Sequence, residues 1–461
     1  MLALKGWGRS SVVEQRSFKP WVVGSTPTAL TSLRAVAALL LAAAVAAPAS
    51  PQNEPLEYLP RVGVRAGRDR AAFTRGADDA PFFVKGFNYV RLRGGDHATF
   101  DADTGSTRAH YDPERAEAML RTLGAAGCNA VRVFVLGRSR GNPGIAGHPD
   151  STKGVYGPYM DHVTDFLRRA TRHRVYVFPT FGDGELPISR HYRSMLRPGH
   201  EGVNGILFTA EGIEAKKTYV ADFLRAVRER DPRLLSTLLG VQCQNELYVA
   251  CDRWPFTVRE GKLPMPNGKS YDMASDRERR LLMDEGIRHY HDEIARAVKA
   301  VDPQVLVAEG IFTLRAVGKT LKTHEGIAPD TKGDRRYPPT LPTLGSGSLD
   351  FMDVHYYPVR RGADLGEDFR ADMDSSLLFA PEMGEIRKRK PILLGEFGAF
   401  RHVQKDFAEV ERLMPAVRDL AAAQGFNGWL YWTYDCREQE PLWNAMDGGE
   451  EFVRKLAGTK P

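Results

Sequence analysis

The sequence predicts a (β/α)8 barrel, the TIM-barrel class of α/β fold, with long loops after its strands. Short apolar runs rich in β-branched and aromatic residues alternate with amphipathic helical stretches. This alternation implies parallel strands joined by right-handed crossovers. Eight such strand runs can be identified, which is the number that closes a barrel. Long insertions follow the strands, whereas the connections from a helix to the next strand are short.

The candidate strands and helices alternate along the chain after residue 80. The strands are FFVKGFNY (82–89), NAVRVFVL (129–136), VYVFPTFG (175–182), LLGVQCQNE (238–246), VLVAEG (305–310), FMDVHYYP (351–358), PILLGEFG (391–398) and GFNGWLYWTY (425–434). The helical segments include 113–127, 211–230, 278–300 and 407–425. Their apolar residues recur at helical spacing, so that Ala116, Leu120 and Leu123 share one face of the first.

The regions outside these elements indicate where a site would lie. A hairpin-like segment from Val62 to Phe73 precedes the first strand. Insertions rich in Gly, Pro and charge occupy 137–157, 183–210, 247–274, 311–349 and 359–388. Loops that follow strands form the active-site face of a barrel. An open doubly wound sheet is the rival fold, but no G-x-G-x-x-G motif follows the first strand.

The first 49 residues form a leader that we expect to lie outside the folded domain. In residues 31–49, Arg34 precedes an apolar run that ends in a small-x-small site with cleavage after Ala49. This pattern is typical of a secretory signal peptide. We therefore expect a secreted or periplasmic protein without a stable membrane span after cleavage, and an uncleaved anchor is the alternative.

Residues 1–30 do not fit a normal signal peptide. Their sequence resembles the translation of a transfer-RNA gene, so we interpret them as a mis-annotated start, with a natural disordered extension as the alternative. After the signal peptide, residues 50–60 form a Pro-containing linker. Residues 61–461 then form a single catalytic barrel domain.

Composition and charge argue against nucleic acid as a partner. The chain has 461 residues, with 42% hydrophobic and 26% charged residues, which is ordinary globular composition. Of the formal charge of +6, residues 1–49 supply +4, from five basic residues against one acidic residue, and leave +2. No basic stripe is present along the remaining chain.

Four cysteines leave the redox chemistry open. Cys128, Cys243, Cys251 and Cys436 show no C-x-x-C spacing, so no zinc site is expected. An exported chain permits disulfides, and four cysteines allow three pairings. Buried free thiols are the equal alternative.

Two glutamates end strands that lie opposite each other in the predicted barrel. Glu396 stands in GEFG at the end of the seventh strand, and Glu246 in QCQNELY at the end of the fourth. In a closed barrel both strand ends face one cavity. Two carboxylates across a cavity can divide acid/base and nucleophilic work, as glycosidic bond cleavage requires.

With these motifs, residues 55–461 resemble the glycoside hydrolases of clan A, and within it family 5, the cellulase and mannanase family. The pair Asn245-Glu246 resembles the acid/base motif on strand four, and Gly395 to Gly398 resemble the nucleophile strand. The resemblance implies a retaining double displacement. Glu396 would be the nucleophile, Glu246 the acid/base with a raised pKa, and Asn245 a donor to the sugar 2-hydroxyl.

Three further residues match supporting positions of the family. Arg132 in NAVRVF corresponds to the arginine on strand two that pairs with the nucleophile. Its charge would keep Glu396 ionised. His355 and Tyr357 in DVHYYP correspond to a substrate-binding histidine and a tyrosine that donates to the nucleophile.

Other positions match the family less fully. Trp432 in WLYWTY corresponds to the aromatic platform under the sugar, and Asn88 ends the first strand as a further supporting candidate. Many members of the family carry a histidine after strand three, where this sequence has Phe181 and Asp183 instead. The sugar contacts at that edge therefore differ from the family pattern.

The resemblance implies an enzyme that hydrolyses O-glycosyl compounds (EC 3.2.1.-). The expected substrate is a β-linked polysaccharide or oligosaccharide of the mannan or glucan type, and no metal or organic cofactor is needed. A carbohydrate-binding pseudoenzyme and a transglycosylase on the same barrel are the alternatives. A metal-dependent hydrolase is disfavoured, because no cluster of His and Asp sits at successive strand ends. The sequence does not distinguish internal from terminal cleavage.

Overall fold

The computed structural model describes residues 55–93, 96–102, 110–135, 144–182, 186–324, 327 and 333–458. The chain divides into two compact units, Met1–Leu56 and Glu57–Pro461, and the second contains every element described below. The predictions for the leader, 1–49, fall outside the described residues, as do parts of the predicted insertions. None of the helices in the described part of the chain has the length and apolar composition of a membrane span.

Eight parallel strands close into a barrel, as predicted. In barrel order they are β4 (Val84–Tyr89), β7 (Ala130–Phe134), β8 (Tyr176–Thr180), β9 (Val241–Gln242), β13 (Val307–Phe312), β15 (Phe351–His355), β16 (Ile392–Phe397) and β18 (Gly428–Tyr431). The ring closes where β18 pairs with β4, with Gly428 opposite Val84. Each predicted strand is found, although β9 is only two residues long because the chain turns at Cys243.

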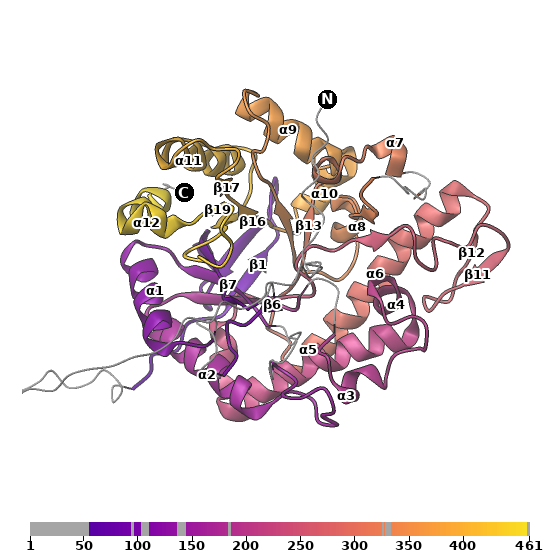
Figure 1. The fold of residues 1–461 in the computed structure, drawn as a ribbon, viewed down its shortest axis with the longest axis horizontal. Coiled ribbons are helices and arrows are strands. Elements are labelled where there is room, and N and C mark those ends of the chain that lie inside the picture. The colour runs from indigo at the N-terminus through magenta and orange to yellow at the C-terminus, as the bar shows by residue number, and fades with distance from the viewer. Residues whose placement is uncertain are drawn as a thin grey trace, which may run out of the picture. The chain divides into compact units, whose positions relative to one another are not determined.

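Helices follow the strands and ring the barrel (Figure 1). They are α1 (Pro113–Ala125), α2 (Gly157–Arg172), α3 (Arg190–Arg193), α4 (Val203–Phe208), α5 (Ala210–Arg230), α6 (Asp276–Val301), α7 (Leu321–His324), α8 (Leu341–Gly345), α9 (Leu365–Ser375), α10 (Pro381–Arg387), α11 (Phe407–Ala423) and α12 (Gly449–Ala457). Short 3-10 helices span Pro232–Thr237, Leu314–Val317 and Ala445–Asp447.

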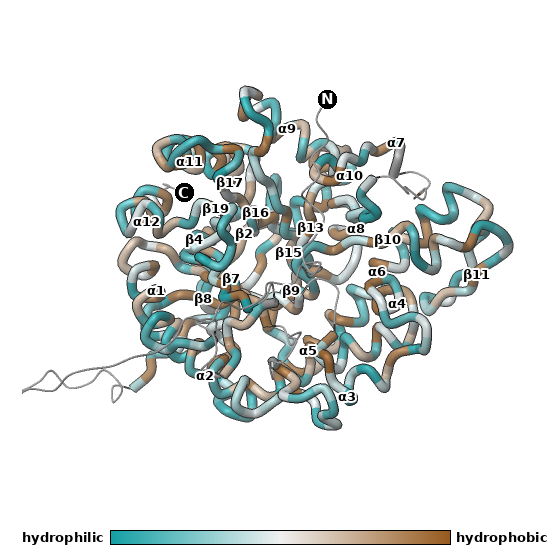
Figure 2. The backbone as a smooth tube through the Cα atoms, viewed as in Figure 1, coloured by the Kyte–Doolittle hydropathy of each residue, from teal (hydrophilic) through white to brown (hydrophobic). Residues whose placement is uncertain are grey.

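Local sequence explains where the long helices begin. Asp112, Ser275 and Asp406 precede α1, α6 and α11, and each side chain accepts a backbone N–H of the first turn. Such caps satisfy donors that have no partner within the helix. The apolar face of each helix then packs on the strands. Figure 2 shows hydrophobic and hydrophilic residues in alternation along the surrounding helices, as expected of helices with one apolar face.

A three-stranded antiparallel sheet covers the amino-terminal end of the barrel. It contains β1 (Val62–Arg65), β2 (Ala72–Arg75) and β3 (Ala80–Phe82), so the predicted hairpin is extended by one strand. Phe73 packs edge-on against Phe351, the first residue of β15, with ring centroids 5.1 Å apart. Leu59 is buried in the same cluster, so packing begins just before β1.

The remaining strands form small antiparallel pairs in the loops. These are β5 (Leu92–Arg93) with β6 (Asp96–His97), β10 (Val249–Ala250) with β14 (Arg336–Tyr337), β11 (Lys262–Pro264) with β12 (Ser270–Asp272), and β17 (Ala399–Phe400) with β19 (Leu442–Trp443). The pair β10–β14 ties the loop after β9 to the loop after β13. Each pair lies in a segment that follows a barrel strand, so the loops at the carboxyl end have their own backbone hydrogen bonds.

All four cysteines are free thiols and all are buried. Burial raises the pKa of Cys128 and of Cys436 to about 12. Because the thiolate is the reactive form, the folded protein is expected not to react with an aromatic disulfide reagent at pH 8. Unfolding in denaturant without a reducing agent should release four reactive thiols per chain. A count of two or none after unfolding would contradict this, since it would require a disulfide.

Candidate active site

The carboxyl ends of the barrel strands bring most of the predicted residues into one cluster. Glu396 lies in β16 and Arg132 in β7, on opposite sides of the closing pair β18–β4. His355 is the last residue of β15, and Glu246 follows β9. These positions are far apart in sequence, and the barrel alone makes them neighbours.

Glu396 is held by two hydrogen bonds, one on each oxygen. Arg132 donates from Nη1 to Oε1 at 2.6 Å, and the Tyr357 hydroxyl donates to Oε2 at 2.7 Å. Burial outweighs the charges of His355 and Arg132 and raises the pKa of Glu396 above its ordinary value, so the expected lowering by Arg132 is present but does not set the net direction. Burial and the charge of Glu396 raise the pKa of Tyr357 well above its ordinary value, so Tyr357 remains a donor. Both predicted contacts to Glu396 are therefore present.

The guanidinium of Arg132 is fully buried and makes hydrogen bonds on all three nitrogens. Besides Glu396, it donates to Asn88 Oδ1 at 2.9 Å, to Gln242 Oε1 at 2.7 Å and to Asn245 Oδ1 at 2.5 Å. This fork fixes the side chain, because a guanidinium presents its donors in one plane. Asn88 is 0% exposed and donates to the backbone oxygen of Gly395. It therefore links Arg132 to the strand that carries Glu396.

Glu246 differs from the prediction that its pKa is raised. His355 Nδ1 lies 3.0 Å from Glu246 Oε1 and 3.5 Å from Glu396 Oε2. Burial raises the pKa of Glu246, but the hydrogen bond and charge of His355, together with the charges of Arg336 and Arg132, outweigh it and lower the pKa below its ordinary value. The sequence could not show this, because it places His355 at a strand end without showing which way the imidazole faces.

His355, predicted to bind substrate, is buried in the ligand-free protein, and that role stays a prediction. The side chain is 2% exposed and lies between carboxylates. Burial lowers its pKa, but the charges of Glu396 and Asp353 and the hydrogen bond to Glu246 outweigh burial and raise the pKa to about 10. In the ligand-free protein His355 is thus an imidazolium that contacts the two glutamates rather than the solvent.

Asn245 and Trp432 lie at the rim of the cluster. Asn245 accepts from Arg132 and donates its backbone N–H to Gly182 O at 2.6 Å, which holds the start of the loop after β9. Trp432 packs edge-on against Phe134 with ring centroids 5.8 Å apart and donates Nε1 to Gln439. The residues packed around Trp432 are apolar. The role of Trp432 as a sugar platform stays a prediction.

At the third strand, where the sequence departs from the family pattern, the ring of Phe181 turns away from the site. It packs edge-on against Tyr219 and Phe223 of α5. Asp183, the other residue of that departure, lies outside the described residues. Phe181 is therefore a core residue, and it supplies no sugar contact.

Two buried polar residues of the cluster were not predicted. Gln242 in β9 accepts from Arg132 and donates to Asp353 Oδ2 at 2.7 Å, and Asp353 in β15 also lies 3.5 Å from His355 Nε2. Both side chains are 0% exposed. A sequence signal existed, because each is a polar residue inside an otherwise apolar strand.

Gly395 is the first glycine of GEFG. Because it has no side chain, the carboxylate of Asp353 can pack directly against its backbone. A Cβ added to Gly395 would lie 2.0 and 2.1 Å from the two carboxylate oxygens of Asp353. Gly395→Ala is therefore expected to lower the free energy of unfolding by about 1–3 kcal/mol, as overpacking of a core does. Chemical denaturation monitored by circular dichroism would measure this.

Gly384→Ala is the matched control for that substitution. Gly384 lies in α10, and an added Cβ would meet nothing within 4 Å. This variant should be as stable as the wild type or more stable by up to about 1 kcal/mol, because Ala is the better helix former. Equal stability of Gly395→Ala and Gly384→Ala would refute the explanation given for Gly395.

The cluster also contains the residue types of a metal site. Glu246, His355 and Glu396 offer ligand atoms within 4.8 Å of one another, the one such group in the described part of the chain. A histidine ligand must be neutral to donate a lone pair. Since the pKa of His355 is raised to about 10, Nδ1 carries a proton that it donates to Glu246. A metal ion at these residues would first have to displace this proton.

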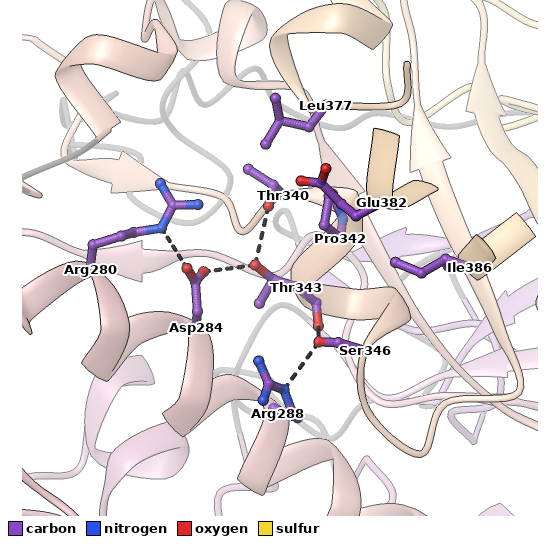
Figure 3. A pocket seen from close by; sticks show the side chains of 10 residues that line it. All are labelled: Arg280, Asp284, Arg288, Thr340, Pro342, Thr343, Ser346, Leu377, Glu382 and Ile386. Carbon is purple, nitrogen blue, oxygen red and sulfur yellow. Dashed lines mark hydrogen bonds and ion pairs between the residues drawn. The ribbon is translucent and has the colours of Figure 1, made fainter. Parts of the chain in front are cut away.

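A groove on the outer surface belongs to a different part of the molecule. It has a volume of about 310 Å³ and lies between α6, α8 and α10 (Figure 3). Three of its four charged side chains make hydrogen bonds within it: Arg280 and Thr343 donate to Asp284, and Arg288 donates to Ser346. No aromatic side chain lines it, and it does not contain the two glutamates of the cluster.

Comparison with known proteins matches the fold. No protein-family model and no curated protein sequence matches the chain. The endo-1,4-β-mannanase of Rhizomucor miehei has 14% identity over 86% of this chain and 98% of its own, with a TM-score of 0.55. The β-mannanase of the blue mussel Mytilus edulis has 16% identity over 87% and 97%, with a TM-score of 0.51. A family 5 mannosidase of Rhizomucor miehei has 14% identity over 86% and 96%, with a TM-score of 0.53.

At these identities the comparisons establish the fold that the chain shares with family 5 glycoside hydrolases. The resemblance predicted from the sequence is thereby confirmed at the level of the fold. The chain spans nearly the whole length of these three structures.

Proposed function

We propose that this chain is a retaining β-glycoside hydrolase that cleaves a β-linked polysaccharide or oligosaccharide by double displacement. The spacing of the two glutamates carries the proposal, because one carboxylate oxygen of Glu246 and one of Glu396 lie within 4.8 Å of each other. Retaining glycosidases hold their carboxyl groups about 5–5.5 Å apart, whereas inverting enzymes need about 6.5–9.5 Å to admit a water molecule. The short spacing supports the retaining mechanism.

In the first step Glu396 attacks the anomeric carbon and Glu246 donates a proton to the departing oxygen. Arg132 and Tyr357 hold the attacking carboxylate in place. Glu246 must be protonated at this point, although His355 lowers its pKa in the ligand-free protein. A bound sugar would cover its side chain, which is 23% exposed, and desolvation favours the neutral acid.

In the second step Glu246 removes a proton from water, which releases the sugar from Glu396. Once Glu396 is esterified it carries no charge, so Glu246 has one negative neighbour fewer. The charge of His355, 3.0 Å away, then stabilises the carboxylate form of Glu246. The same residue can thus serve as acid first and as base afterwards.

The substrate class rests on comparison rather than on a contact in the site. The similar structures described above are mannanases and a mannosidase, which favours a β-mannan, with β-glucan retained from the sequence resemblance. Export from the cell is proposed from the apolar run and small-x-small site at residues 31–49. A polymeric substrate fits an exported enzyme.

The test uses protein that begins at residue 50 and a panel of β-mannan, cellulose derivatives, mixed-linkage glucan, xylan and galactan. Reducing ends are counted for the wild type and for Glu396→Gln in parallel. Release from one polymer, absent in the variant, would support the hydrolase and identify its substrate. Proton NMR of the first product formed should show the β-anomer. An α-anomer would overturn the retaining mechanism, and equal binding of one polymer by both proteins without cleavage would favour a binding module.

A further inference from the structure

A buried set of contacts behind the two glutamates connects Arg132 to His355 without passing through Glu396. Arg132 Nε donates to Gln242, Gln242 Nε2 donates to Asp353 Oδ2, and Asp353 Oδ2 lies 3.5 Å from His355 Nε2. None of these side chains is more than 2% exposed. The amide of Gln242 is fixed in orientation, because its oxygen accepts from one neighbour and its nitrogen donates to the other.

The imidazole of His355 has a carboxylate oxygen within 3.5 Å of each ring nitrogen, although Nε2 makes no hydrogen bond among the described residues. Nδ1 faces Glu246 from the end of β9 and Glu396 from β16, and Nε2 faces Asp353 on its own strand. Arg132 is the cation on the other side of Glu396. On the adjoining strand β13, Glu309 is turned away, because it pairs with His291 of α6 at 2.9 Å.

Asp353 depends on His355 for its charge compensation. Its Oδ2 accepts from the neutral amide of Gln242, and its Oδ1 is buried without a hydrogen-bond partner among the described residues. Gly395 packs against the same carboxylate, and a side chain at position 395 would collide with it. A buried carboxylate is costly unless a cation is close. The nearest cation in the set is the imidazolium of His355.

We propose that Asp353 is a positioning residue, which acts through His355 to fix the location and the charge state of Glu246. The carboxylate of Asp353, 3.5 Å from Nε2, attracts the protonated ring from one side, so that Nδ1 faces Glu246 on the other. Gln242 keeps the carboxylate of Asp353 from turning toward Arg132. The catalytic consequence rests on the proposed function, whereas the effect on His355 can be measured without any substrate.

The first experiment follows the protonation of His355 in the protein labelled with ¹⁵N-histidine. Two-dimensional NMR between pH 5 and pH 10.5 records the ring nitrogens, and the spectrum of His355→Gln assigns the signal. Wild-type His355 should remain an imidazolium through pH 9. In Asp353→Asn, which keeps the shape and removes the charge, the midpoint should fall by about 1–3 units.

The second experiment measures pH profiles of hydrolysis for the same two proteins. We expect kcat of Asp353→Asn to fall by about 10–100-fold, the size typical of losing a group that orients a reacting side chain from behind. KM should change little, because Asp353 does not contact the substrate. Activity of the variant should decline at the pH where its His355 loses the proton, whereas a purely structural role predicts a uniform loss at every pH.

Asp372→Asn is the matched control. Asp372 is likewise a buried aspartate, at 7% exposure, but it lies in α9 and binds Thr313 and Arg315. This variant should leave both the His355 titration and the pH profile unchanged. The proposal is overturned if wild-type His355 titrates near 6.5, or if folded Asp353→Asn keeps the wild-type midpoint. If Asp353→Asn does not fold, the titration of His355 in the wild type alone tests the proposal. Absence of all hydrolysis by the wild type would overturn the proposed function only.

Discussion

Glu396→Gln is expected to reduce kcat by on the order of 10⁴-fold or more, with little change in affinity for the polymer. The amide cannot form a stable covalent bond to the anomeric carbon, so the first step has no nucleophile. Glutamine also offers one acceptor where Glu396 accepts from both Arg132 and Tyr357. Initial rates on the polymer identified by the substrate panel would measure the loss.

The shorter variant Glu396→Ala separates loss of the nucleophile from loss of structure. Removing the side chain opens space for a small anion such as azide, which can attack the anomeric carbon from the same face. We expect azide to restore activity and to give an α-glycosyl azide. The control is Glu382→Gln, at an exposed position of α10, which should keep the wild-type rate. More than a hundredth of wild-type activity in Glu396→Gln would rule out Glu396 as the nucleophile.

Glu246→Ala is expected to show a loss that depends on the leaving group. On a polysaccharide, whose departing hydroxyl needs a proton, kcat/KM should fall by about 10²–10⁴-fold. On an aryl glycoside with an acidic phenol, the first step should proceed almost unaided. The second step then limits the rate, because no base activates the water. A burst of phenol followed by slow turnover would show the stalled intermediate.

Azide again provides the diagnostic product for Glu246. In Glu246→Ala it attacks the glycosyl-enzyme from the face that water normally uses, so the product should be a β-glycosyl azide. Opposite azide anomers in the two variants would assign the two glutamates independently of any rate. Identical losses on both substrates for Glu246→Ala would contradict its role as the acid.

The sequence predicted the fold and most of the cluster because both follow from strand ends. Apolar runs at regular intervals gave the number of strands, and parallel strands in a closed barrel must bring their carboxyl ends together. Arg132, Tyr357 and the two glutamates were placed correctly for this reason. Arg132 and Glu396 lie within strands, and Tyr357 and Glu246 follow within four residues of a strand end, so strand position alone brings them close.

Contacts that depend on side-chain direction could not be predicted in the same way. His355 was correctly placed at the end of β15, yet whether its ring faces solvent or Glu246 depends on Asp353 and on the missing side chain of Gly395. Gln242 lies within a strand whose inward face cannot be distinguished when most neighbours are buried. The leader and its export remain predictions.

The closing seam of the barrel has a consequence for biosynthesis. Strand β18 pairs with β4, and Thr433 donates to the backbone oxygen of Asn88, 345 residues earlier. At about 5–20 residues per second, a ribosome needs about 20–70 s between these two points. Until then β4 has an unpaired edge that can associate with other chains. Chains cut short before β18 should therefore aggregate or be degraded.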